Sequence, residues 1–191
     1  MKQIIYLTGF MGSGKSTIGP ILANTLGWDF YDLDRVIEEK TGKKIKEIFN
    51  EDGEPFFRRI ETETLWDLSF KDKVIISLGG GTIVNRENIK ILKDTGKLIY
   101  LKMSMEAALG RLKHKRDRPA LKNDAEDFSE EDLINTISGL MEARAEYYEQ
   151  ADFSIDTDKS TVGKTVDKIV QLISKSGLDQ NLEQNKNKNQ N

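Results

Sequence analysis

The chain has 191 residues, of which 37% are hydrophobic and 32% charged, with a net charge of −3. This is the balance of an ordinary globular protein, and a negative chain is not typical of nucleic-acid binding. The absence of cysteine excludes disulfides, thiolate metal sites and a cysteine nucleophile, and it suits the cytoplasm. The N-terminal stretch is too short in apolar length for a signal peptide, and no run approaches the ~18 apolar residues of a membrane span.

Short apolar runs alternate with longer amphipathic stretches along the chain. In chain order, the expected elements are a strand over 4–7, a helix over 16–26, a strand over 28–33, helices over 35–40, 45–49 and 55–68, a strand over 74–76, a helix over 85–93, a strand over 97–101, helices over 104–113 and 130–150, a strand over 153–155 and a helix over 161–173. This order predicts an α/β fold, a five-stranded parallel sheet with helices on both faces. Ligands bind such sheets at the carboxyl ends of the strands.

The first strand leads into a glycine-rich loop, Gly9-Phe10-Met11-Gly12-Ser13-Gly14-Lys15-Ser16, which matches the phosphate-binding pattern G-x-x-x-x-G-K-[ST]. Glycines allow backbone N–H groups to surround phosphates, and the N-terminus of the following helix favours the same anion. Lys15 would neutralise the β- and γ-phosphate oxygens, and the Ser16 hydroxyl would ligate Mg²⁺. A dinucleotide-binding loop is excluded, because Thr17 stands where its third glycine should be.

This loop predicts a bound nucleoside triphosphate but does not specify the reaction. GTP switches, ATPases and small-molecule kinases all use it, and the absence of a guanine-reading N-K-x-D pattern argues against a GTP switch. The phosphate contacts are expected from Gly12, Ser13, Gly14, Lys15, Ser16 and Thr17. Pro20 falls inside the helix that follows, where it removes a hydrogen bond, and Gly19 before it would allow a bend.

Asp32 and Asp34 come at the end of the second expected strand. Residues two apart on an extended segment face the same way, so both carboxylates are expected to point into the crevice beside the loop. One can hold Mg²⁺, and the other can accept a hydroxyl proton from an acceptor substrate. The alternative is structural: a solvated loop carboxylate, with Asp34 as the N-cap of the next helix.

Three consecutive glycines, Gly79, Gly80 and Gly81, follow the third strand. They remove side chains where a ligand could approach bare backbone. A structural turn needs only one or two glycines, so a substrate-binding floor is the better interpretation.

Two arginines are candidates for binding an anionic acceptor. Arg58 and Glu61 are three apart and can meet on one face of a helix, which leaves a surface ion pair as the alternative. Arg144 lies on the apolar stripe of its helix, between Met141 and Tyr148. A charge on the inward face needs a partner, either an anionic ligand or a buried carboxylate of the protein, and arginine binds a carboxylate through two hydrogen bonds.

The stretch over about 113–128 is charged and rich in turn residues. Pro119 biases Arg118 toward extended geometry, and a lid over the phosphates is expected here, with an exposed charged loop as the alternative. From 176 onward the residues are polar and offer little to bury, so 176–191 is expected to be a disordered tail after one domain over 1–175.

Together these residues resemble the shikimate kinase family, over nearly all of 2–173. The resemblance rests on "GFMGSGKSTIG", "DLD", "DGEPFFRRIE", "LGGG", "RP" and "EARAEYY", in this order. It implies a P-loop kinase fold with a lid loop, and transfer of the γ-phosphate of ATP to the 3-hydroxyl of shikimate, a step toward chorismate and the aromatic amino acids.

The resemblance also implies roles on the acceptor side. Asp34 would hold the shikimate hydroxyls and help to activate the nucleophile. Arg58 and Arg144 would bind the carboxylate of shikimate. The glycines at 79–81 would form the floor of the substrate site.

On the nucleotide side, the resemblance implies that Asp32 lies near Mg²⁺, with Ser16 as a metal ligand. Arg118 would reach the phosphates from the lid and act in catalysis together with Lys15 and Asp34. Arg111 would stack on adenine. The family often has a proline after the fifth strand as the opposite wall, and Asp156-Thr157-Asp158-Lys159 has none.

The expected partners are therefore ATP with Mg²⁺ and shikimate, without nucleic acid or membrane, in a cytoplasmic monomer. Another P-loop kinase with a hydroxylated carboxylate as acceptor, such as a gluconate kinase, is the nearest alternative. A nucleotide-binding module without catalysis is the other. The combination of "DLD", "FFRRIE" and "LGGG" favours shikimate.

Overall fold

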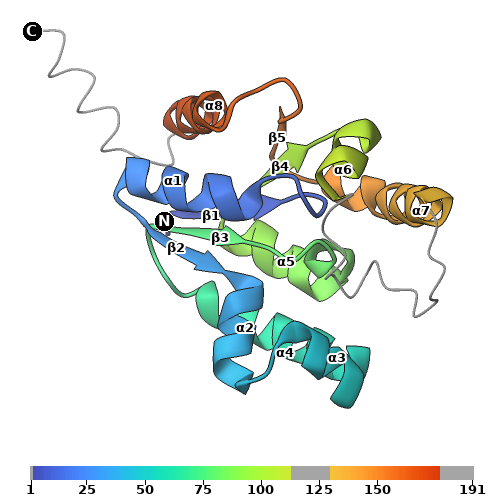
Figure 1. The fold of residues 1–191 in the computed structure, drawn as a ribbon. Helices are drawn as coiled ribbons and strands as arrows, with labels where there is room; N and C mark the ends of the chain where they lie inside the picture. Colours follow the sequence, from blue (N-terminus) through green and yellow to red (C-terminus); the bar gives the residue numbers. More distant parts are fainter. Residues whose placement is uncertain (1, 113–129, 177–191) are drawn as a thin grey trace, which may run out of the picture.

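The computed structural model describes residues 2–112 and 130–176. Its elements alternate as expected from the sequence (Figure 1). The first half contains β1 (Ile4–Thr8), α1 (Lys15–Leu26), β2 (Asp29–Asp32), α2 (Leu33–Thr41), α3 (Ile45–Glu51), α4 (Gly53–Leu68) and β3 (Val74–Ser77). The second half contains η1 (Thr82–Val84), α5 (Arg86–Thr95), β4 (Lys97–Lys102), α6 (Met105–Leu112), α7 (Glu130–Tyr148), β5 (Phe153–Asp156) and α8 (Val162–Lys175).

The strands form one five-stranded sheet in the order β2-β3-β1-β4-β5, and every neighbouring pair is parallel. The α/β prediction is thus confirmed, and all five expected strands are present. Parallel pairing brings the carboxyl ends of β1, β2 and β3 to one edge of the sheet, where the loop, the aspartates and the glycine triplet follow them. The expected lid over 113–128, with Arg118, and the tail after Ser176 lie outside the described residues.

Alternate residues of the central strand enter two different cores, as the two-residue period of a strand requires. Ile4 and Tyr6 pack with α2, α4 and α5 on one face of the sheet. Ile5 and Leu7 pack with α1 and α8 on the other face. Figure 1 shows α1 and α8 on one side of the sheet and α5 on the opposite side. With both faces covered, the central strand is buried along its whole length.

The boundary between β2 and α2 differs from the prediction. The strand was expected to run to Leu33, but it ends at Asp32, and Leu33 already begins α2. Asp32 is the N-cap of this helix, since its Oδ1 accepts a hydrogen bond from the backbone N–H of Arg35 at 3.5 Å. The alternative that Asp34 caps the helix was therefore wrong. Leu33 is fully buried, and its burial in the core favours this early turn into the helix.

None of the helices in these two ranges is both long and apolar enough to cross a membrane.

Helix α1 continues through Pro20, which lies exposed on its surface. The glycine before it has a packing role that the sequence did not suggest. A Cβ on Gly19 would lie 2.3 Å from Cε2 of the Phe30 ring, so a side chain there would displace the ring that covers α1. Nothing in the structure explains Pro20 itself.

We therefore expect Gly19→Ala to lower the free energy of unfolding by about 1–3 kcal/mol, because overpacking against the Phe30 ring outweighs the gain in helix propensity. Urea unfolding of the purified variant measures this. Gly139→Ala is the matched control, since Gly139 lies inside α7 and a Cβ added there would have nothing within 4 Å. The control should raise the free energy of unfolding by about 0.5–1 kcal/mol. Equal effects at both positions would contradict the packing role.

Candidate active site

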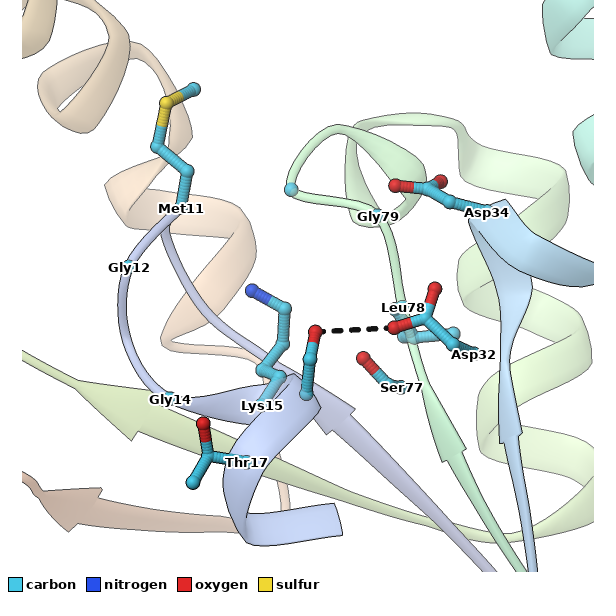
Figure 2. A pocket seen from close by; sticks show the side chains of 12 residues that line it. Met11, Gly12, Gly14, Lys15, Thr17, Asp32, Asp34, Ser77, Leu78 and Gly79 are labelled. Atoms are coloured by element: carbon cyan, nitrogen blue, oxygen red, sulfur yellow. Dashed lines mark hydrogen bonds between the residues drawn. The ribbon is translucent and has the colours of Figure 1, made fainter. Parts of the chain in front are cut away.

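A cavity of about 160 Å³ lies at the carboxyl ends of β1, β2 and β3, and we call it the nucleotide cavity. It is lined by Met11, Gly12, Gly14, Lys15, Ser16, Thr17, Asp32, Asp34, Ser77, Leu78, Gly79 and Gly80. Figure 2 shows the glycine-rich loop with Lys15 on one side of this cavity and both aspartates on the other. Segments that are far apart in the sequence therefore meet where a parallel sheet binds its ligand.

The glycine-rich loop has the geometry of an anion-binding loop. Gly12 and Gly14 have φ angles of 83° and 97°, a region that favours glycine. Gly14 is also the N-cap of α1 and provides no side-chain hydrogen bond there. The N-terminal end of α1, with its positive dipole, therefore faces the cavity without a side-chain cap.

Lys15 lies within this loop and is only 8% exposed. Its Nζ donates hydrogen bonds to the carbonyl oxygens of Gly9 at 2.7 Å and Phe10 at 3.1 Å. The ammonium group is thus held at the inner side of the loop, next to the space that phosphate oxygens would occupy. Ser13 differs from the other predicted phosphate contacts, because its side chain is buried beneath the loop and does not line the cavity.

Ser16 and Asp32 form an oxygen pair on the floor of the cavity. The Ser16 hydroxyl donates to Oδ2 of Asp32 at 3.2 Å, the contact that is dashed in Figure 2. A hydroxyl and a carboxylate are hard oxygen ligands of the kind that Mg²⁺ prefers. In residues 2–112 and 130–176 there is no group of three or more His, Cys, Asp or Glu that could hold a metal ion. The pair therefore suits a cation that takes its remaining ligands from phosphate and water.

Asp34 lies in the first turn of α2, not on the strand. The extended-segment reason for expecting Asp32 and Asp34 to face the same way was therefore wrong. Both nevertheless line the nucleotide cavity, one from the N-cap and the other from the first turn of the helix. The Asp34 side chain also lines the neighbouring cavity, which makes it part of the wall between the two.

This second cavity, of about 470 Å³, we call the acceptor cavity. It is lined by Met11, Asp34, Ile45, Phe49, Glu54, Phe57, Arg58, Glu61, Gly79, Gly80, Gly81, Leu140 and Arg144. The two cavities share Met11, Asp34, Gly79 and Gly80. The acceptor cavity combines apolar walls with both predicted arginines, a lining that suits a small anion with a partly apolar body.

Arg58 is held in place by two carboxylates. Its Nη1 donates to Oε2 of Glu61 at 3.0 Å, and its Nη2 donates to Oε1 of Glu54 at 3.0 Å. Glu61 is only 1% exposed, and its other oxygen accepts a hydrogen bond of 2.6 Å from the Thr82 hydroxyl. The expected contact between Arg58 and Glu61 is confirmed. The pair is not a surface ion pair, because its acid is buried and anchored to the loop after β3.

Arg144 reaches the same cavity from α7 and is half-buried. Among the residues that the structure describes, no carboxylate forms an ion pair with it. Its guanidinium instead lies near the Tyr148 hydroxyl, one turn further along α7, and both come within 4 Å of a Cβ placed on Gly80. Burial raises the pKa of Tyr148, and the nearby Arg144 charge lowers it. The alternative of a buried protein carboxylate as partner therefore finds no support in this part of the chain.

Each glycine of the triplet lies beside one of these charged side chains, as the distances from a Cβ placed on each glycine show. A Cβ on Gly79 would lie 3.1 Å from Oδ1 of Asp34. On Gly80 it would lie 3.4 Å from Nη1 of Arg144, and on Gly81 3.1 Å from Nη2 of Arg58. None of the three has a positive φ angle. Glycine at 79 and 81 leaves room for the polar side chains that approach the backbone there, and at 80 the guanidinium lies at ordinary contact distance from an added Cβ.

Arg111 lies outside both cavities and joins two loops. Its Nη1 donates to the carbonyl oxygen of Gly12 at 3.0 Å, and its Nη2 donates to that of Thr157 at 3.3 Å. It thus connects the glycine-rich loop to the segment after β5, at the edge of the nucleotide cavity. A planar guanidinium held in this way offers a face on which a base could stack.

Several cavity residues were not recognised from the sequence. They are Met11, Ile45, Phe49, Glu54, Ser77 and Leu140. Ile45, Phe49 and Leu140 have the helical spacing of an ordinary core, and only the meeting of α3, α4 and α7 at the acceptor cavity distinguishes them. The rings of Phe49 and Phe57 lie 4.7 Å apart on different helices, a contact that the sequence alone does not show.

Comparison with known families favours a shikimate kinase over the alternatives, which were another P-loop kinase and a nucleotide-binding module without catalysis. A sequence model of the shikimate kinase family matches residues 11–174. The chain belongs to the shikimate kinase family. The family resemblance that was inferred from the motifs is confirmed.

Individual members of the shikimate kinase family agree with this assignment. A shikimate kinase from Chlorobaculum parvum is 46% identical over 174 residues, which cover 91% of this chain and 93% of the relative. One from Chlorobium limicola is 45% identical over 172 residues, which cover 90% of this chain and 86% of the relative. The solved structure of a shikimate kinase from Acinetobacter baumannii in complex with shikimate superimposes with a TM-score of 0.84 at 34% identity, covering 94% of this chain and 97% of that chain.

Proposed function

We propose that this protein transfers the γ-phosphoryl group of ATP to the 3-hydroxyl of shikimate, giving shikimate 3-phosphate and ADP. The observation that carries the proposal is the position of Asp34 in the wall shared by the two cavities. One cavity has a phosphate-binding loop and the other has two arginines, so the carboxylate lies where a hydroxyl would meet a γ-phosphate.

On the acceptor side, we assign the carboxylate of shikimate to Arg58 and Arg144, because both guanidinium groups line the acceptor cavity. Arg58 keeps donors for a ligand while Glu54 and Glu61 fix its plane. Asp34 would hold the ring hydroxyls and accept the proton of the 3-hydroxyl as its oxygen attacks phosphorus. Gly79, Gly80 and Gly81 would form the floor.

On the nucleotide side, Lys15 would exchange its carbonyl contacts for the β- and γ-phosphate oxygens. The backbone of Gly12 to Thr17 would surround the phosphates, and Arg111 would support the adenine. Arg118, which lies outside the described residues, is assigned to the phosphates on the resemblance alone. Phosphoryl transfer needs positioning and charge neutralisation more than covalent participation, and these groups supply both.

Mg²⁺ fits the Ser16 and Asp32 oxygens, and when bound it would neutralise charge on the phosphates. We expect Asp32→Asn to raise the Mg²⁺ concentration for half-maximal activity about tenfold, because a carboxylate that holds the cation or its waters is lost. A titration of activity against free Mg²⁺ measures this. Asp94→Asn on α5, outside both cavities, is the matched control. An unchanged Mg²⁺ requirement in Asp32→Asn would remove Asp32 from the metal site.

The proposed reaction is tested by ADP release in a coupled assay, with shikimate and gluconate side by side. Release that depends on shikimate is expected. Turnover with gluconate alone would contradict the proposal, and ATP binding without release for either acceptor would indicate a non-catalytic module. We also propose a single catalytic domain over 1–175, a monomer and a cytoplasmic location. Size-exclusion chromatography with light scattering tests the monomer.

A further inference from the structure

We propose that Tyr148 is a positioning residue for acceptor binding, whose hydroxyl joins the glycine floor to the arginine that binds the acceptor carboxylate. The inference rests on the proposed function, because it names a residue that acts on the same site through Arg144. Tyr148 does not line either cavity, so its effect on the substrate would be indirect.

The Tyr148 hydroxyl makes one hydrogen bond to the glycine floor of the acceptor cavity and lies near the Arg144 guanidinium. It donates to the carbonyl oxygen of Gly80 at 2.8 Å. A phenolic hydroxyl has one donor and can also accept. Its proton goes to Gly80, so its lone pairs remain available to the nearby Arg144 guanidinium. The hydroxyl thereby lies between two residues of the acceptor cavity that are 68 and 4 positions away in the sequence.

Burial and stacking of the Tyr148 ring hold this hydroxyl in one place. Tyr148 is only 2% exposed, and its ring stacks on Tyr100 with a centroid distance of 4.9 Å and an interplanar angle of 14°. Burial raises the pKa of Tyr148 to about 12, although Arg144 lowers it, so the hydroxyl keeps its proton at neutral pH. A rigid, protonated donor is suited to hold the Gly80 carbonyl in one place.

Gly80 and Arg144 also contact each other closely. A Cβ on Gly80 would lie 3.4 Å from Nη1 of Arg144 and 3.9 Å from the Tyr148 hydroxyl. The guanidinium thus lies against bare backbone on one side and receives its orientation from Tyr148. Arginine recognises a carboxylate through its planar fork, so an error in orientation weakens binding even when the charge is unchanged.

The test is Tyr148→Phe, which keeps the ring and its stacking and removes only the hydroxyl. We expect the KM for shikimate to rise about tenfold, because the Gly80 carbonyl loses its donor and the Arg144 guanidinium loses a polar neighbour, while the KM for ATP changes less than about twofold. Tyr100→Phe makes the same chemical change on the other ring of the stack, whose hydroxyl does not make the bond to Gly80, and should change neither KM.

A double-mutant cycle separates positioning from a general loss of structure. If Tyr148 acts through Arg144, then Tyr148→Phe should add little to the KM for shikimate once Arg144→Ala is present. The rise in melting temperature on addition of shikimate is a second measure of binding. It can be compared between variants even if one of them is less stable, because each variant is measured with and without shikimate. It should be smaller in Tyr148→Phe than in the wild type and unchanged in Tyr100→Phe.

Three results would overturn the inference: an unchanged KM for shikimate in Tyr148→Phe, an equal rise in both KM values, or full additivity with Arg144→Ala. Failure of the proposed function gives a different result, since the wild-type protein would then not turn over shikimate at all. Turnover by the wild type, combined with a Tyr148→Phe variant that behaves like Tyr100→Phe, would remove only the role of Tyr148.

Discussion

Replacing Asp34 by asparagine should lower the turnover number for shikimate by about a thousandfold. The amide keeps the size and polarity of the carboxylate but cannot accept the proton of the attacking hydroxyl, and a positioned general base contributes about 10²–10⁴-fold. ATP should still bind, because the phosphate contacts that we propose come from the loop after β1. Steady-state ADP release gives the turnover number, and calorimetric titration gives the ATP affinity.

Asp94→Asn is again the matched control, since it makes the same change on α5, outside both cavities, and should leave turnover within about twofold. If Asp34→Asn lost only affinity for shikimate and kept its turnover number at saturation, Asp34 would be a binding residue and not a base. A variant with unchanged kinetics would show that the wall between the two cavities is not the place of reaction.

The second large effect is expected for Arg144→Ala, which should raise the KM for shikimate about a hundredfold and change the KM for ATP less than threefold. Removing one partner of a desolvated, hydrogen-bonded charge pair typically costs about 2–5 kcal/mol, and 1.4 kcal/mol corresponds to a factor of ten in affinity. Kinetics with each substrate varied in turn measure the two constants. Arg144→Lys should fall between the alanine variant and the wild type, because lysine restores the charge without the fork.

Arg59→Ala provides the control for removal of an arginine side chain. Arg59 lies on the exposed face of α4, where its side chain is 64% accessible and pairs with Glu63 only at 3.9 Å. Exposed pairs of this kind contribute about 0–1 kcal/mol, so both KM values should remain unchanged. If Arg144→Ala weakened ATP and shikimate equally, or lost only folding stability, Arg144 would be a structural residue.

Much of the fold could be predicted from local pattern. Local pattern located all five strands, and the central β1, β3 and β4 most clearly, because strands buried on both faces of a parallel sheet need apolar runs such as Ile4 to Leu7. The β2–α2 boundary was not predictable in this way. Leu33 continues the apolar pattern of the strand, and only the core that it fills determines that the chain turns into a helix at this residue.

The residues of the candidate site could also be predicted only in part from the sequence. A motif with a known mechanism pointed to Lys15 and Ser16, while Arg144 stood out as a charge on an apolar stripe. The contacts between the glycines and the charged groups could not be predicted, because they join positions from different elements. The same applies to the bonds of Arg111, whose partners Gly12 and Thr157 lie 99 and 46 positions away in the sequence.

The short distances between the glycine triplet and its charged neighbours couple substitutions at these positions. Alanine at Gly80 would place its Cβ 3.4 Å from Nη1 of Arg144, with its next nearest neighbours at 3.9 Å, so a shorter side chain at 144 would leave more room for it. At Gly81 the three nearest atoms all belong to Arg58, and the same argument applies. A lineage that adapts to an acceptor without a carboxylate would therefore fill these glycine positions at less cost once the arginine is lost, so the effect of either change depends on the other.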